Sequence, residues 1–341
     1  MEASVEKLFG PERLEDAALR FGLQGNPKKL GDFENYIYEM QTAEGVPVIL
    51  RLTHSSHRSQ EEIEAELDFL RHLEAEGCGK DIASGLASPS GSRIEKIMAA
   101  DGSCFYASLF RKAPGGRAVP DSEAWNRELF AEWGAVTARF HNASAKLDRK
   151  LARRQWSEDD LIANATAYLQ DEDPGVIAQL ASVLDRLHAL PRPEGSYGLL
   201  HGDIHNGNFF VHEGRIMVFD FDDLEYSWYI HDVAIPLYYA LSSRIPDRYG
   251  ADRDAYAADF FLSFLQGYRS ERKMPEEWLD VLGLFLEMRD LTLYTVLAKK
   301  LSPEELTEGI TAWMEPMKER IVAGTPIVSL DFRELAAAAL S

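Results

Sequence analysis

Two short stretches carry the residues whose types and spacing suggest chemistry. The first, HGDIHNGNFF, spans residues 201–210 and places Asp203 five positions before Asn208. The second, FDFDD, contains Asp220 and Asp222. A loop carboxylate can receive or orient the proton of a hydroxyl group, while an amide oxygen and further carboxylates are hard ligands for Mg²⁺. Together these groups suit the transfer of a phosphoryl group to an alcohol.

The same residues allow two other interpretations. His201, Asp203 and His205 alternate, and imidazoles are good Zn²⁺ ligands, so a metal-dependent hydrolase is one alternative. Such a site gives Asn208 no role, which speaks against it. A catalytically silent nucleotide-binding module is the other alternative. The complete set of Asp203, Asn208 and Asp220 argues against a silent module.

Composition limits the class of protein. With 341 residues and a 45% apolar share, the chain is expected to form two domains or lobes with an ordinary globular core. It contains no apolar run of about 18 residues, which a membrane-spanning helix needs. The N-terminus lacks the pattern of a signal peptide. Cys78 and Cys104 are too few for a disulfide framework, so we expect a cytoplasmic protein with reduced thiols.

The charge balance is strongly acidic. The chain has 36 basic and 56 acidic residues, for a formal net charge of −20. Such a charge repels nucleic acid and anionic membranes, so we expect neither as a partner. It favours a cationic substrate, or serves only solubility.

The elements that must position these residues fall into two groups. Residues 36–54 predict two strands around the turn AEGVP, Ser59 to Gly77 predicts a helix capped by Ser59, and residues 92–110 predict a second hairpin. The Gly- and Pro-rich stretch 111–120 then breaks the pattern. Helices dominate after it, except for the hairpin NFFVHEGRIMVFDF.

The predicted fold is therefore α+β and bilobal. Residues 1–111 would form a small, β-rich lobe. Residues 112–341 would form a larger, mainly helical lobe.

The order of Asp203, Asn208, a hairpin and Asp220 resembles the catalytic and metal-binding segments of protein kinases. Gly202 stands where an Arg is usual there, and no DFG motif follows. HGD…N…FDFDD instead resembles the aminoglycoside phosphotransferase and choline kinase superfamily. FDFDDLEYSWYIHDVA is most similar to the bacterial branch with type II homoserine kinases and stress-response kinases. GDFENYIYEM, VILRLTHSSHRS and KAPGG fit the same order, so the resemblance covers most of the chain and a protein-kinase-like fold.

The resemblance implies roles for the acidic residues. Asp203 would be the catalytic base, and Asn208 and Asp220 would bind Mg²⁺. Asp222 would assist a second metal ion or contact the substrate. Asp232, at the start of a helix, would brace the catalytic loop.

It also implies that residues 1–111 form the nucleotide-binding lobe, with a site for ATP, and that residues 112–341 form the catalytic and substrate-binding lobe. Glu66 would face a phosphate-binding strand, where Arg51 replaces the usual lysine and still offers a charged, bidentate group. Gly31 would mark the turn that covers the phosphates. The backbone near Arg111 and Ala113 would hold adenine.

The acceptor is expected to be a hydroxyl-bearing small molecule, with a serine/threonine protein substrate of the stress-response type as the alternative. Glu287, Asp290 and Tyr294 lie three and four residues apart and share one helix face. With nearby aromatic residues they would bind an amine on the acceptor, or they form only a solvated face. His201, Tyr226, Trp228 and Tyr229 are expected to be structural. The sequence predicts no oligomeric state.

Overall fold

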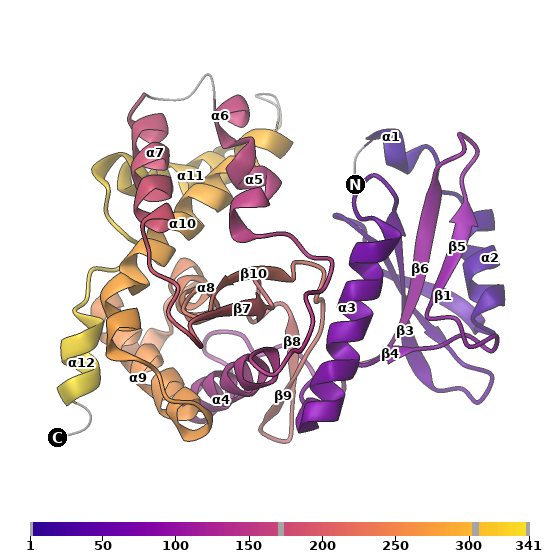
Figure 1. Cartoon of the computed structure of the whole chain (residues 1–341), viewed down its shortest axis with the longest axis horizontal. Helices are drawn as coiled ribbons and strands as arrows, with labels where there is room; N and C mark the ends of the chain where they lie inside the picture. The colour runs from indigo at the N-terminus through magenta and orange to yellow at the C-terminus, as the bar shows by residue number, and fades with distance from the viewer. Residues whose placement is uncertain (1–2, 170–173, 302–306, 339–341) are drawn as a thin grey trace. The chain divides into compact units, whose positions relative to one another are not determined.

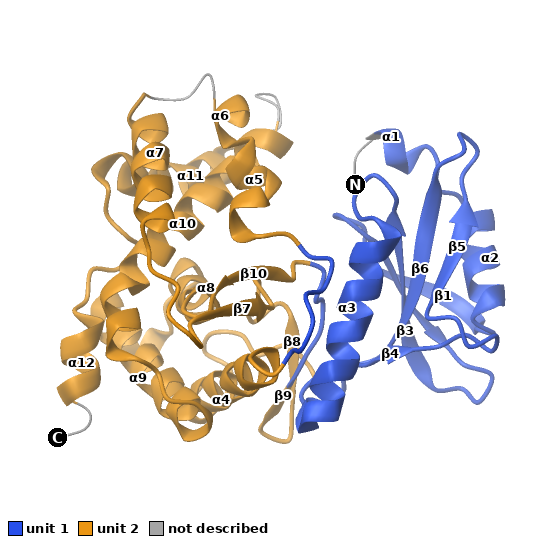
Figure 2. Ribbon diagram, in the orientation of Figure 1, with its two compact units in different colours: residues 1–115, 147–153, 217–222 blue, residues 116–146, 154–216, 223–341 orange. Residues whose placement is uncertain are grey.

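A computed structural model describes residues 3–169, 174–301 and 307–338. The chain forms two compact units, coloured separately in Figure 2. The first unit comprises residues 1–115, 147–153 and 217–222, and the second comprises 116–146, 154–216 and 223–341. The unit that contains the N-terminus thus also includes residues 147–153 and 217–222, which lie after the boundary predicted at residue 111. The predicted α+β class is confirmed.

A mixed-order antiparallel sheet forms the centre of the first unit (Figure 1). Its strands run in the order β1-β2-β3-β6-β4, and β5 pairs with the same strand β6. The strands are β1 (Gln24–Gly31), β2 (Tyr36–Gln41), β3 (Pro47–His54), β4 (Gly85–Leu86), β5 (Ile94–Met98) and β6 (Cys104–Arg111). Both predicted hairpins are present, as β2–β3 and β5–β6.

The two faces of this sheet are covered by different helices. The helices of this unit are α1 (Ala3–Glu6), α2 (Pro11–Arg20) and α3 (Gln60–Leu73), and a π-helical turn (Glu74–Cys78) follows the last. Figure 1 shows α2 and α3 on opposite sides of the sheet. Because side chains alternate along a strand, Leu50 and Leu52 join the core under α2, whereas Arg51 between them points to the α3 side.

The start of α3 is fixed as predicted. The Ser59 side chain accepts a hydrogen bond from the Glu62 backbone N–H, and the Glu62 carboxylate accepts one from the Ser59 N–H. This capping box satisfies two N–H groups that would otherwise lack partners in the helix. It fixes where the helix begins and therefore where Glu66 lies along it.

The second unit is mainly helical. Its long helices are α4 (Arg127–Ser144), α7 (Pro174–His188), α8 (His231–Ser242), α9 (Arg253–Glu271), α10 (Glu276–Lys300) and α11 (Glu308–Ala323). Shorter ones are α5 (Asp160–Ala163), α6 (Ala165–Tyr168) and α12 (Phe332–Ala338), with 3₁₀ turns at Trp156–Glu158 and Asp247–Tyr249. Strands β7 (Tyr197–Leu200) and β10 (Glu225–Trp228) pair, and β8 (Phe209–His212) forms the predicted hairpin with β9 (Arg215–Val218).

Helices α4 and α9 approach each other closely because glycines face the contact. A Cβ atom on Gly134 would lie 1.9 Å from the Phe264 carbonyl oxygen, and one on Gly267 would lie 1.7 Å from that of Ala131. Both positions therefore need glycine. The resulting position of α4 matters for the loop after β7, because the Trp133 indole N–H donates to the Ile204 carbonyl oxygen at 3.1 Å.

Two sequence expectations about the class of protein can be compared with the described residues. Cys78 and Cys104 are both buried and unbonded to each other. Among the helices that the structure describes, none combines the length and apolarity needed to cross a membrane.

Candidate active site

The loop after β7 is held from the start of α8. Asp232, the second residue of α8, accepts hydrogen bonds from the backbone N–H groups of His201 at 3.0 Å and Gly202 at 2.9 Å. Burial alone would raise the pKa of Asp232, but the hydrogen bond from His141 and the other histidines around the carboxylate together lower this pKa. Gly202 has φ +80°, and a Cβ there would lie 2.6 Å from the Asp223 carbonyl oxygen, so only glycine fits. The bracing role predicted for Asp232 is confirmed.

Asp203 lies in this loop with three donors on its carboxylate. The Asn208 amide donates to Oδ2 at 3.2 Å, and His205 Nε2 lies 3.2 Å from the same oxygen. Arg289, from α10, donates to Oδ1 at 2.7 Å. Burial alone would raise the pKa of Asp203, but the Arg289 charge and the His205 hydrogen bond hold it well below its usual range. The carboxylate is therefore ionised and fixed in orientation.

The tautomer of His205 follows from its contacts. The Gly207 backbone N–H donates to Nδ1 at 2.9 Å, so the proton is on Nε2, which faces Asp203. A Cβ on Gly207 would lie 2.4 Å from the His205 ring, so glycine makes room for it. The ring also stacks on Tyr239 with centroids 4.3 Å apart. Both ring nitrogens of His205 thus have partners within this loop.

In the first unit, Arg51 and Glu66 form a closed ion pair. The two guanidinium Nη atoms donate to the two carboxylate oxygens at 3.0 and 2.5 Å, and the side chains are 4% and 1% exposed. Burial would lower the pKa of Arg51, but the charges of Glu66, Asp222 and Asp220 and the hydrogen bonds to Glu66 together raise this pKa. The guanidinium also lies over the Phe110 ring, 4.8 Å from its centroid. The ion pair that the sequence suggested is thus present and bidentate.

Asp220 lies beside this pair. Its Oδ1 is 3.8 Å from Arg51 Nη1, and its side chain is 38% exposed. Its backbone is in the left-handed region, with φ +63°, which non-glycine residues adopt at a cost of about 1–3 kcal/mol. The predicted metal-binding role of Asp220 stays a prediction.

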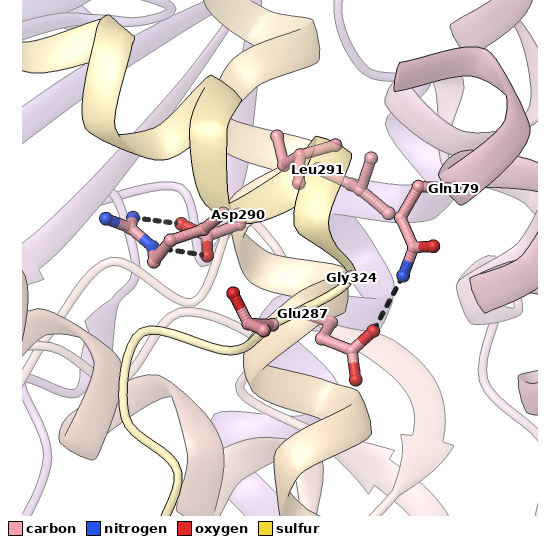
Figure 3. Close-up of a pocket in the computed structure, with 8 residues that line it drawn as sticks. Gln179, Glu287, Asp290, Leu291 and Gly324 are labelled. Carbon is pink, nitrogen blue, oxygen red and sulfur yellow. Dashed lines mark hydrogen bonds and ion pairs between the residues drawn. The ribbon is translucent and has the colours of Figure 1, made fainter. Parts of the chain in front are cut away.

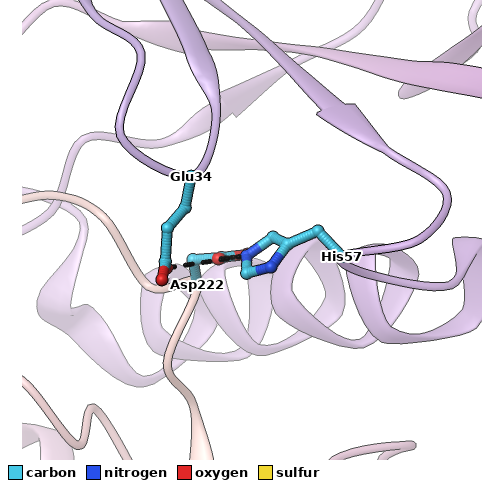
Figure 4. Close-up of side chains that lie close together, drawn as sticks. All are labelled: Glu34, His57 and Asp222. Carbon is cyan, nitrogen blue, oxygen red and sulfur yellow. Dashed lines mark hydrogen bonds and ion pairs between the residues drawn. The ribbon is translucent and has the colours of Figure 1, made fainter. Parts of the chain in front are cut away.

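Asp222 is surrounded by donors of the same unit. His57 Nε2 lies 2.9 Å from Oδ2, Asn35 donates to Oδ2 at 3.4 Å, and Arg58 donates to Oδ1 at 3.4 Å. Figure 4 shows Glu34 beside His57 as well, at 3.7 Å. Burial would raise the pKa of Asp222, but Arg58 and His57 lower it far below its usual range. Arg58 already compensates the charge of Asp222, and the predicted role of Asp222 at a second metal ion stays a prediction.

Comparison with known proteins identifies the family. Residues 29–273 match the model of the phosphotransferase enzyme family, which is 72% of the chain by its numbering (245 of 341 residues). The chain belongs to this phosphotransferase family. The predicted superfamily, kinase activity and kinase-like fold are thereby confirmed. The use of a nucleotide and a divalent metal ion as cofactors is likewise supported.

Individual relatives of this phosphotransferase have been characterised. The amicoumacin kinase of Bacillus subtilis (strain 168) is 32% identical over 336 residues, which cover 97% of this chain and 98% of the relative. The structure of amicoumacin kinase hAmiN in complex with AMP-PNP, Ca²⁺ and Ami has a TM-score of 0.88 at 31% identity, over 98% and 100% of the two chains. A microcompartment-associated aminopropanol kinase has the same fold, with a TM-score of 0.74 at 23% identity over 94% and 100%.

The hinge of the phosphotransferase follows β6. The Arg111 backbone N–H donates to the Ser84 carbonyl oxygen at 2.9 Å. Ala113 follows two residues later and is buried. The predicted adenine contact with the backbone near Arg111 and Ala113 stays a prediction.

The predicted amine site on α10 is wrong. Glu287 accepts hydrogen bonds from Arg186 at 2.5 Å and Gln179 at 2.9 Å. Asp290 is 1% exposed and accepts from Tyr238 at 2.7 Å and Arg320 at 2.6 Å. The two arginines compensate both charges. Figure 3 shows Glu287 and Asp290 lining a pocket whose cavity volume is ≈ 0 Å³. An ammonium group has neither free charge nor space there.

Other residues have the structural roles expected of them. Trp228 and Tyr229 are 5% and 1% exposed and donate to Pro191 and Ser144. The His201 ring accepts the Asp203 backbone N–H at 3.2 Å. Sequence reasoning missed the roles of the residues that contact Asp203 or Asp222, which are Asn35, His57, Arg58, His205 and Arg289. It also missed Gly207 and Tyr239, which contact His205 and Arg289.

Proposed function

We propose that this kinase transfers the γ-phosphoryl group of ATP to a hydroxyl group of an amicoumacin-type small molecule. The observation that carries the substrate class is the similarity to an amicoumacin kinase over nearly the full length of both proteins. Phosphoryl transfer to a small molecule is the activity that the family membership supports.

In the proposed mechanism, Asp203 accepts a hydrogen bond from the acceptor hydroxyl and orients its oxygen toward the γ-phosphorus. A bond forms between that oxygen and phosphorus, the bond from phosphorus to the bridging oxygen breaks, and ADP leaves. The hydroxyl proton passes to Asp203 and then to solvent. An ionised, immobile carboxylate is suited to this role because it needs no reorganisation.

The proposed metal ligands are oxygen atoms of Asn208 and Asp220. The Asn208 amide nitrogen donates to the Asp203 carbonyl oxygen at 2.9 Å and to Oδ2 at 3.2 Å, which directs its Oδ1 away from Asp203. An amide oxygen and an exposed carboxylate fit Mg²⁺, which prefers hard oxygen ligands. When bound, the ion neutralises charge on the phosphates. We also propose that Arg51, held by Glu66, contributes positive charge to nucleotide binding.

Two measurements test this function. First, Mg-ATP should raise the melting temperature, because a ligand that binds only the folded state stabilises it by mass action. Second, ADP release should be measured with amicoumacin, amino alcohols, homoserine-like amino acids and aminoglycosides as acceptors. Stabilisation together with acceptor-dependent ADP release on amicoumacin is the expected result. Stabilisation with no response to amicoumacin would leave a kinase with a different acceptor, and the absence of stabilisation would contradict the function itself.

A further inference from the structure

The carboxylate of Asp203 has one place left for a ligand. A carboxylate offers about four lone-pair positions, two on each oxygen. Oδ2 faces two donors, Asn208 and His205, whereas Oδ1 accepts a hydrogen bond only from Arg289 among the described side chains. The acceptor hydroxyl therefore has its position on Oδ1, next to Arg289.

Arg289 has donors that the protein does not use. Its Nη2 donates to Asp203 and to the Tyr239 hydroxyl, and its guanidinium lies 4.9 Å from the centroid of the Tyr239 ring. Its Nε is buried and has no hydrogen-bond partner among the described residues. The side chain is 16% exposed and that of Asp203 is 17% exposed. The pair is thus partly accessible, and the guanidinium is fixed on one nitrogen only.

We propose that Arg289 binds an oxygen of the acceptor close to the hydroxyl that is phosphorylated, so that it selects acceptors by this group. The chemical class is a carbonyl, amide or carboxylate oxygen, because a guanidinium is a planar fork of donors without any acceptor. His205 and Tyr239, the other side chains around Asp203, carry no negative charge to attract an amine. An amine on the acceptor therefore binds away from Arg289. The inference rests on the proposed function and refines its substrate class.

The test compares two acceptors that share an amine and a hydroxyl but differ in one carboxamide group, which supplies a carbonyl oxygen. 1-Amino-2-propanol lacks it, and threonine amide carries it. The kinase, Arg289→Lys, Arg289→Met and the control Arg186→Met are assayed with both. Arg186 lies on α7 and contacts Glu287 of α10, so its variant also removes one positive charge that contacts this helix.

The wild type should prefer threonine amide in kcat/KM by about tenfold or more, because a site built for a hydrogen bond discriminates against a ligand lacking it. Arg289→Met should bring the ratio of the two kcat/KM values, threonine amide over 1-amino-2-propanol, near one. Arg186→Met should leave this ratio unchanged. Arg289→Lys keeps a charge beside Asp203 but loses the fork, so it should recover kcat more than the acceptor KM. The KM for ATP should stay constant throughout.

Each other outcome overturns a distinct statement. An unchanged ratio in Arg289→Met, or a wild-type ratio near one, would overturn the role of Arg289. A parallel rise in the KM for ATP would show a structural effect instead. If the wild type uses neither compound nor amicoumacin while Mg-ATP still stabilises it, the proposed acceptor class fails and this inference fails with it.

Discussion

Each unit contains an arginine–carboxylate pair at its candidate site, and the two pairs are built differently. Arg51 and Glu66 use both guanidinium Nη atoms and both carboxylate oxygens, and at most 4% of either side chain is exposed. Arg289 and Asp203 share a single hydrogen bond, and 16% and 17% of their side chains are exposed. The pair of Arg51 and Glu66, here called the closed pair, has all these groups bonded and is almost unexposed. The pair of Arg289 and Asp203, the open pair, keeps hydrogen-bond donors and a lone-pair position for a ligand.

The difference indicates what each pair contributes. A buried, bidentate ion pair holds two elements in register, and removing one partner leaves an uncompensated charge in the interior. A partly exposed pair with one hydrogen bond can exchange partners when a ligand binds, because water or the ligand replaces the hydrogen bond that is lost. We therefore expect Arg51 variants to affect stability and nucleotide use together, and Arg289 variants to affect the acceptor alone.

The largest expected effect is on Asp203 itself. Asp203→Asn removes the proton acceptor and should lower kcat by about 10²–10⁴-fold, the usual contribution of general acid–base catalysis. Stabilisation by Mg-ATP should persist, because Asp203 is assigned to the acceptor. Asp185→Asn, which removes an exposed carboxylate from α7, is the control. If Asp203→Asn retains most of the turnover, the open pair is not catalytic.

Breaking the closed pair should have the next largest effect. Arg51→Met leaves Glu66 buried and unpaired, which should lower the free energy of unfolding by about 3–5 kcal/mol and raise the KM for ATP. Arg51→Lys should recover part of both, because it restores the charge without the bidentate geometry.

The double variant Arg51→Met, Glu66→Leu separates the two contributions of this pair. It removes both charges, so denaturant unfolding should show most of the stability recovered. The KM for ATP should stay high because the cation is still missing. Recovery of ATP use in the double variant would show that Arg51 acts only through folding.

A smaller effect is expected from a substitution that moves His205, the side chain that contacts Asp203 of the open pair. Gly207→Ala would place a Cβ 2.4 Å from the His205 ring, which must then move away from Asp203. We expect kcat to fall by about tenfold, as for a misplaced catalytic group, with little change in the KM for ATP. Gly283→Ala is a matched control, since its Cβ would meet only Pro326 at 4.0 Å. Equal kcat for both variants would show that His205 does not orient Asp203.

The sequence predicted what local patterns encode. Alternation along residues 36–54, the cap at Ser59 and the spacing from Asp203 to Asn208 each lie within a short stretch, and the elements that they predict are present. Asp232 was placed correctly through a resemblance, not through a pattern.

The partners of these residues depended on the fold and were not predictable in the same way. Glu287 and Asp290 lie on either side of Arg289 in the sequence, but only tertiary packing reveals that Arg186 and Arg320 neutralise the two acids. The same packing directs Arg289, which lies between the two acids in the sequence, at Asp203. The sequence offered one signal that was overlooked, a basic residue between two acidic ones in LEMRD.

The smallest effect is expected from a third carboxylate–cation pair, which tests whether exposure alone makes a pair functional. Asp160 accepts hydrogen bonds from Lys299 at 2.7 Å, Asn164 at 2.7 Å and Tyr168 at 2.8 Å, and the Lys299 and Asp160 side chains are 35% and 43% exposed. Burial would raise the pKa of Asp160, but these hydrogen bonds lower it from 3.8 to about 2. Because the ionised form is favoured in the folded state, its stabilising contribution is complete above pH 3.8 and is lost as the pH falls toward 2.

Asp160→Asn should therefore lower the free energy of unfolding at neutral pH by about 0.2–1 kcal/mol, as is usual for exposed pairs. The difference from wild type, measured by urea unfolding, should shrink as the buffer is acidified from pH 3.8 toward pH 2. Kinetic constants for ATP and the acceptor should not change, because none of the described contacts of Asp160 involves the residues around Asp203 or Arg51. If Asp160→Asn changed the KM for the acceptor as much as Arg289→Met does, the loss of any exposed pair would disturb the acceptor site. The contrast between the open and the closed pair would then have no functional meaning.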